Sequence, residues 1–169
     1  VLMDDLVNKV VKKLKERQKN NVTLSFDELV SPPNEKVFIN NSCIILKNIS
    51  IQFIKDLYIL EGNNRWVSWT LDGIDLGVHF YFQINKNIVN FIPRYMILDW
   101  PINFITNNET LIVTSYNKII SRKEIATIPD NAIFIKVVNQ KISNEAMDLC
   151  NEKNISLRIR TEENCIWLK

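Results

Sequence analysis

The side chains that most often perform acid–base chemistry are sparse in this chain. The only histidine is His79, in the alternating run GVHFYFQI, where Val78, Phe80, Phe82 and Ile84 face one side of a strand and His79 faces the other. A histidine on the polar face of a strand is more often an ordinary strand residue than a general base or a metal ligand. A single histidine also cannot build a multi-histidine metal site, and any nucleophile–histidine pair would have to form around it.

Three aspartates, Asp72, Asp75 and Asp99, could pair as carboxylates or bind a hard cation. The first two flank Gly73 in an expected turn, however, where aspartate is favoured for backbone reasons. The chain holds only three glycines, too few for a P-loop or a GxGxxG turn. Its three cysteines, Cys43, Cys150 and Cys165, are widely spaced without a CxxC pair, so neither a disulfide framework nor a zinc site is indicated. We therefore expect a protein that is not an enzyme, with no catalytic, cofactor-binding or metal-binding residues.

The charge of the chain is concentrated near its start. Of 169 residues, 46% are hydrophobic and 24% are charged, which is typical of a folded domain. The net charge of +2 divides into +3 for residues 1–19 and −1 for residues 20–169. Because nucleic-acid binders usually carry basic residues across the folded domain, we expect no nucleic-acid partner. The absence of a long apolar run or a secretion signal predicts a cytoplasmic protein that does not enter a membrane.

The segment LVNKVVKKLKERQ has the pattern of an amphipathic helix. Apolar residues recur at steps of three and four, the period of one helical face, and they are Met3, Leu6, Val7, Val10, Val11 and Leu14. A helix of this length is marginal alone in water, so its apolar face needs a cover. The cover could be the protein's own core, a groove or helix bundle of a partner, or a membrane or nucleic acid.

The remaining elements predict one α+β domain. We expect residues 1–20 to form a docking helix, residues 21–36 a linker with a short helical turn, and residues 37–169 an α+β domain. Within it we predict a hairpin around Asn40-Asn41, a helix in the stretch SIQFIKDLYIL (50–60), and an antiparallel strand meander over 65–98 that includes Trp66 and Trp69 on opposite faces of a strand. The clearest pattern is C-terminal: a strand at 132–138, a helix at 144–153 capped by Ser143 and a strand at 155–159 form a parallel βαβ unit.

Three segments resemble one protein family. The opening segment, LVNKVVKKLKERQKNNVTLSFDEL (6–29), has an amphipathic helix of the IVxxIVxxL type that runs into a TLS stretch. A second segment, LIVTSYNKIISRKEIATI (111–128), contains an S-x-x-[DE]-[IV] motif. The closing unit (132–159) carries Ala146 and Asp148 in an A-x-D pattern before Asn154-Ile155-Ser156-Leu157. These features resemble those of the PduM family of propanediol-utilisation microcompartment proteins. Ser143 of this chain stands where that family tends to have threonine.

The resemblance implies a non-catalytic structural component of a bacterial microcompartment that links or organises shell proteins and encapsulated enzymes. The site would then be the apolar face of the N-terminal helix, and no cofactor is implied. Two alternatives remain open. One is an auxiliary enzyme of the same pathway with a cleft around His79, Tyr81 and Asp75, and the other is a small-molecule or peptide-binding module whose N-terminal helix packs in its own core. The oligomeric state, the bound protein and the substrate of the compartment are not predicted.

Overall fold

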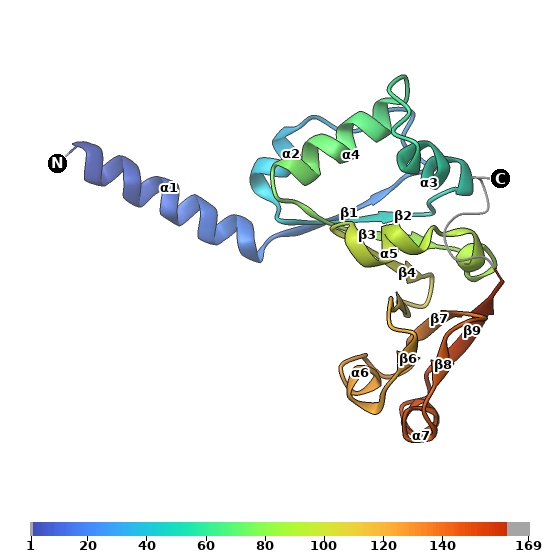
Figure 1. Cartoon of the computed structure of the whole chain (residues 1–169). Helices are drawn as coiled ribbons and strands as arrows, with labels where there is room; N and C mark the ends of the chain where they lie inside the picture. Colours follow the sequence, from blue (N-terminus) through green and yellow to red (C-terminus); the bar gives the residue numbers. More distant parts are fainter. Residues whose placement is uncertain (1, 162–169) are drawn as a thin grey trace.

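The computed structural model describes residues 2–161 of the chain, and these form one long helix attached to a mixed α/β body, residues 21–161 (Figure 1). The helices are α1 (Leu2–Lys19), α2 (Lys36–Asn40), α3 (Ile51–Tyr58), α4 (Arg65–Asp75), the 3₁₀ helix η1 (Lys86–Phe91), α5 (Arg94–Asp99), α6 (Arg122–Ala126) and α7 (Asn144–Glu152). The strands are β1 (Asn21–Ser25), β2 (Cys43–Lys47), β3 (His79–Ile84), β4 (Ile102–Thr106), β5 (Leu111–Thr114), β6 (Ile119–Ile120), β7 (Ile133–Val137), β8 (Lys141–Ile142) and β9 (Ser156–Arg160).

Seven of these strands form the central sheet, in the order β1-β2-β3-β4-β5-β7-β9. All neighbours are parallel except β4 and β5, which pair antiparallel. Strands β6 and β8 form a small parallel sheet of their own. Because parallel neighbours need a crossover connection, a helix lies between most consecutive strands of the large sheet.

The two faces of the sheet are covered unequally. The larger core packs α2, α3, α4, η1 and α5 against strands β2, β3 and β4 on one face, through side chains such as Leu46, Phe80 and Phe104. A smaller core packs α6 and α7 around Phe134 of β7. Ile133 and Ile135, the neighbours of Phe134, belong to the larger core, so the two cores lie on opposite faces of β7.

The fold class and the C-terminal unit agree with the sequence prediction. The chain is an α+β protein with an N-terminal helix, and β7, α7 and β9 form the predicted parallel βαβ unit. Ser143 caps α7 because its hydroxyl accepts a hydrogen bond from the Ala146 backbone N–H at 3.2 Å. The helix predicted within 50–60 is α3.

The predicted antiparallel meander over 65–98 is wrong. Residues 65–75 form helix α4, and only β3 in this region is a strand, with parallel neighbours on both sides. Asn64 begins α4, since its side chain accepts a hydrogen bond from the Trp66 backbone N–H at 3.0 Å. Trp66 and Trp69 therefore lie on one buried side of a helix rather than on opposite faces of a strand.

Two smaller predictions near the start of the chain are also wrong. Residues 37–40 form part of helix α2, so no hairpin exists at Asn40-Asn41. Residues 21–25, expected in a linker, are the edge strand β1, which pairs parallel with β2 from Asn21 opposite Cys43 to Ser25 opposite Lys47. Val22 and Leu24 of β1 also pack against the larger core, so this edge strand is held by tertiary contacts as well as by its pairing with β2.

Candidate docking helix

Helix α1 projects from the body (Figure 1). Its charges suit a helix: Asp4 and Asp5 lie in the first turn, and Arg17 and Lys19 lie in the last. Acidic residues near the N-terminus and basic residues near the C-terminus of a helix interact favourably with its dipole. These end charges add to the stability of α1, although a helix of this length is marginal alone in water.

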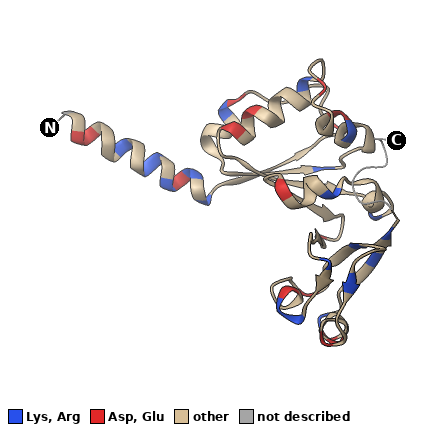
Figure 2. Cartoon of the chain, viewed as in Figure 1, with Lys and Arg blue, Asp and Glu red and all other residues tan. Residues whose placement is uncertain are grey.

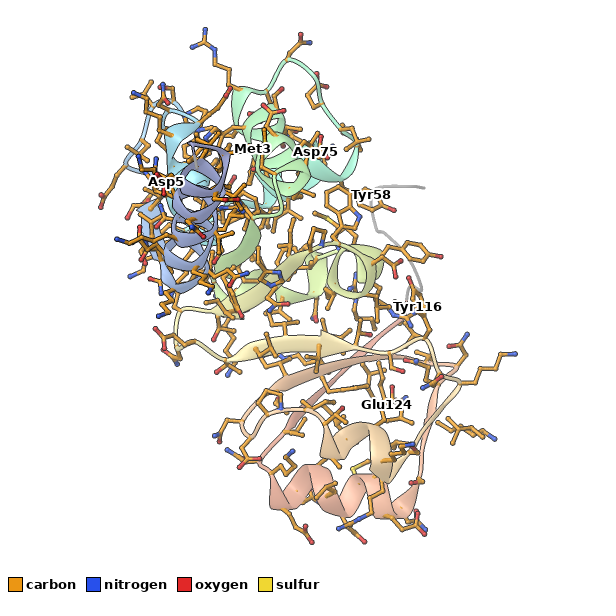
Figure 3. All side chains as sticks on the ribbon, turned by 90° about the vertical axis from the view of Figure 1, so that its left-hand side faces the viewer. Met3, Asp5, Tyr58, Asp75, Tyr116 and Glu124 are labelled. Carbon is orange, nitrogen blue, oxygen red and sulfur yellow. The ribbon has the colours of Figure 1, made fainter. Side chains whose placement is uncertain are left out.

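The six apolar residues predicted for α1 are all exposed. We call them the apolar stripe, and their exposed fractions are 78% for Met3, 63% for Leu6, 54% for Val7, 50% for Val10, 41% for Val11 and 51% for Leu14. The helix therefore does not pack in the protein's own core, as one alternative reading required. Met3, at the outer end of the stripe, is labelled in Figure 3, which views the molecule from the side of α1.

The inner end of α1 is held by Arg17. Its Nε donates a hydrogen bond to the Phe38 carbonyl at 2.8 Å, and one of its terminal nitrogens donates to the Leu76 carbonyl at 2.7 Å. Phe38 lies in α2 and Leu76 follows the last residue of α4. One cation thus contacts carbonyls at the C-terminal ends of two helices, where positive charge is favoured. The Ser42 backbone N–H also donates to the Arg17 carbonyl, at 3.1 Å.

Lysines surround the apolar stripe on the rest of α1 (Figure 2). Lys9, Lys12, Lys13 and Lys15 form no ion pair with any residue that the structure describes. Over residues 2–19, six basic side chains stand against three acidic ones. The helix thus presents an apolar face within a positively charged surface.

A groove opens where α1 meets the body. We call it the basal groove; it has a volume of about 290 Å³ and is lined by Val10, Lys13, Leu14, Arg17, Phe38, Ile39 and Leu76. Ile39 of α2 is 60% exposed and Leu76 is 52% exposed. Sequence reasoning missed both, because Ile39 was assigned to a strand and nothing in the pattern places Leu76 beside α1. The apolar stripe therefore continues onto the body.

The residues considered for an enzymatic cleft do not meet. His79 and Tyr81 lie on the half-exposed face of β3, with ring centroids 5.3 Å apart. Asp75 is exposed in the last turn of α4, which packs on the opposite face of β3 through Gly73 and Phe80. The sheet therefore separates Asp75 from the other two side chains.

The other reactive groups show little sign of activation. Burial raises the pKa of the Cys43 and Cys150 thiols, which opposes formation of the nucleophilic thiolate. Cys165 lies outside the described residues. Asp99 accepts a hydrogen bond from the Tyr116 hydroxyl at 2.5 Å; desolvation, this hydrogen bond and the carboxylate charge raise the pKa of Tyr116 to about 12. Within residues 2–161, we find no cluster of three or more side chains suited to hold a metal ion.

Nothing among the described helices combines the length and the apolar character needed to cross a bilayer.

A comparison with protein families matches residues 5–156 to the family PDU_like, described as "Putative propanediol utilisation". Comparison with curated proteins and with solved structures finds no match. The family match includes all but the outermost residues of α1 and reaches the start of β9. The chain therefore belongs to the PDU_like family, which connects it with propanediol utilisation.

Proposed function

We propose that this protein is a non-catalytic assembly component of a bacterial propanediol-utilisation microcompartment, and that α1 docks it to a shell protein or an encapsulated enzyme. Membership of the PDU_like family supports the pathway. The narrower resemblance to the PduM family, noted in the opening helix and in the closing βαβ unit, supports the assembly role. In this proposal the protein resides in the compartment within the cytoplasm.

The observation that carries the docking role is the exposed apolar stripe of α1. Removing its six side chains from water would stabilise a complex by roughly 1 kcal/mol each, because about half of each side chain is already shielded by the helix itself. This gross gain of about 6 kcal/mol is smaller than the free energy of a micromolar complex, about 8 kcal/mol, and the cost of association reduces it further, so the stripe alone supports weak binding and a tighter complex needs added contacts. The stripe is therefore suited to reversible docking.

The body has a different role in this proposal. Neither of its two cores includes a residue of α1, so the stripe is left free for a partner. The body can thus engage a second component while α1 is occupied. An auxiliary enzyme is the weaker candidate, because His79 and Tyr81 lie across the sheet from Asp75.

The test follows the protein in a bacterium that produces propanediol-utilisation compartments. A fluorescent fusion of the full chain should form foci that coincide with a labelled shell protein. The double variant Leu6→Ser, Val10→Ser should become diffuse, because two central side chains of the stripe are lost. Asn8→Ser, an exposed polar site on the same helix, serves as the matched control and should keep the foci. If the double variant stays in the compartments at the wild-type level, α1 is not the docking element.

A further inference from the structure

The apolar stripe and the basal groove form one continuous surface across two parts of the molecule. Val10 and Leu14 belong to both, and the groove adds Ile39 and Leu76 from the body. The two added side chains are as exposed as those of the stripe itself. Arg17 keeps the two parts together, because it donates hydrogen bonds to the carbonyls of Phe38 and Leu76, which themselves line the groove.

The shape of this surface suits a helix. The stripe runs along α1 from Met3 to Leu14, a span of 12 residues, which at 1.5 Å per residue is about 18 Å. An occupant that follows the stripe must itself be elongated and apolar along one side. At the inner end, the groove of about 290 Å³ has room for one or two large aliphatic side chains of such an occupant. An amphipathic helix meets both requirements.

The charges around the surface indicate the rim of the occupant. Lys9 and Lys13 follow one another at a four-residue step, and Lys13 also lines the groove beside Arg17. Neither lysine is neutralised by a described residue within ion-pair distance. Aspartate or glutamate beside the apolar face of an occupant would therefore find unpaired cations, whereas a basic rim would be repelled.

A second copy of this chain fits less well. Two α1 helices would bring like charges together, since each carries a net charge of +3 over residues 2–19. The surface is better matched to a different protein with opposite charge.

We propose that the apolar stripe and the basal groove together bind an amphipathic helix of another protein, whose apolar side chains are bordered by aspartate and glutamate. This inference rests on the proposed docking role of α1 and adds Ile39, Leu76 and the charge of the partner. Ile39 and Leu76 are binding residues on the body in this arrangement, while Arg17 positions α1 beside them.

The experiment uses the full chain and two synthetic peptides of the same length as α1. Both carry leucine at steps of three and four, one with glutamate beside the leucines and the other with lysine. Fluorescence anisotropy should show saturable binding of the glutamate peptide, at least about tenfold tighter than the lysine peptide at low salt. Raising the salt concentration should weaken this preference, because exposed charges are screened.

Variants of the body test the groove separately from α1. The double variant Ile39→Ser, Leu76→Ser should weaken binding of the glutamate peptide about tenfold. Ile59→Ser is the matched control, since Ile59 is 49% exposed just after α3 and outside the groove. Circular dichroism should show the same helix content in all variants, because the three side chains are exposed.

The outcomes distinguish this inference from the proposed function. Equal binding of the two peptides, no saturable binding of the glutamate peptide, or an unchanged affinity of the groove variant would each overturn the inference. If Leu6→Ser, Val10→Ser disperses the compartment foci while the groove variant keeps full affinity for the peptide, docking by α1 stands and the groove is not part of it. A concentration-dependent dimer in sedimentation, abolished by the groove variant, would show that the occupant is a second copy and would also overturn the inference.

Discussion

Replacing Gly73 by alanine should destabilise the body, because this glycine lets α4 lie directly on the sheet. A Cβ atom at residue 73 would meet Phe80 Cζ at 2.7 Å, Phe38 Cε1 at 2.9 Å and Phe80 Cε2 at 3.0 Å. Both rings are buried, with exposed fractions of 0% for Phe80 and 1% for Phe38, and Phe80 also contacts Trp69 with ring centroids 5.8 Å apart. Neither ring can move aside without displacing its own neighbours.

The size of the effect follows from two opposing contributions. Inserting a methyl group into a filled core costs about 1–3 kcal/mol, and three contacts at or below 3.0 Å place Gly73→Ala near the upper end. Alanine in a helix interior is favoured over glycine by about 1 kcal/mol, which offsets part of that cost. The expected net loss is about 2 kcal/mol, equivalent to a decrease in Tm of roughly 4–8 °C for a chain of this size.

Urea unfolding monitored by tryptophan fluorescence measures this loss, since Trp66 and Trp69 lie in the same helix as Gly73. Gly62→Ala is the matched control, because a Cβ there would have no atom within 4 Å. That variant should unfold at the wild-type urea concentration or slightly above it. If Gly73→Ala unfolds together with Gly62→Ala, the close packing of α4 on Phe80 is refuted.

Two further predictions concern Arg17 and Tyr116. Arg17→Ala removes both hydrogen bonds from α1 to the ends of α2 and α4, so the distance between spin labels at residues 8 and 123 should change from a narrow to a broad distribution. The free energy of unfolding should fall by only about 1–2 kcal/mol. An unchanged narrow distribution would show that Arg17 does not hold α1 against the body. Tyr116 has a folded pKa of about 12, above its usual 10, so its neutral form stabilises the fold fully below pH 10 and this contribution is lost as the pH rises through 12. Absorbance titration should show that Tyr116→Phe removes a phenol that ionises near pH 12, and loss of a phenol that ionises near pH 10 instead would argue against the bond to Asp99.

Local signals in the sequence predicted the elements that are locally determined. The βαβ unit at the C-terminus was evident because Ser143 caps a helix between two apolar runs, and the structure has the same elements within one or two residues. The strand β3 has its predicted sides, since Phe80, Phe82 and Ile84 are buried while His79 is half-exposed. In these elements the period of the apolar residues and the cap agree with the tertiary structure.

The sequence misled where residue preference and spacing disagreed. Trp66, Val67 and Trp69 favour strands by type, and Asp72-Gly73 resembles a turn, so residues 65–75 were assigned to strands. The buried positions 66, 69, 70 and 73 instead follow helical spacing, and this spacing, with the Asn64 cap, was the signal that could have identified α4. Glycine at 73 marks a close approach to Phe80 rather than a turn.

The candidate site was predicted in part. The apolar stripe follows from periodicity alone, whereas its exposure depends on the path of the chain after residue 19, which periodicity does not contain. The contribution of Ile39 and Leu76 depends on the ends of two helices meeting α1. These two residues lie 22 and 59 positions after Arg17 in the sequence. Side chains brought together over such separations leave no local pattern to read.

The bracing of α1 by Arg17 has a geometric consequence. A flexible linker lets a bound partner sample many distances from the body, but a helix fixed at its inner end by hydrogen bonds to two other helices acts as a spacer of set length and direction. Whatever binds along its roughly 27 Å is then held at one distance and angle from the sheet. In a layered assembly, such a spacer defines the gap between neighbouring components as well as their connection.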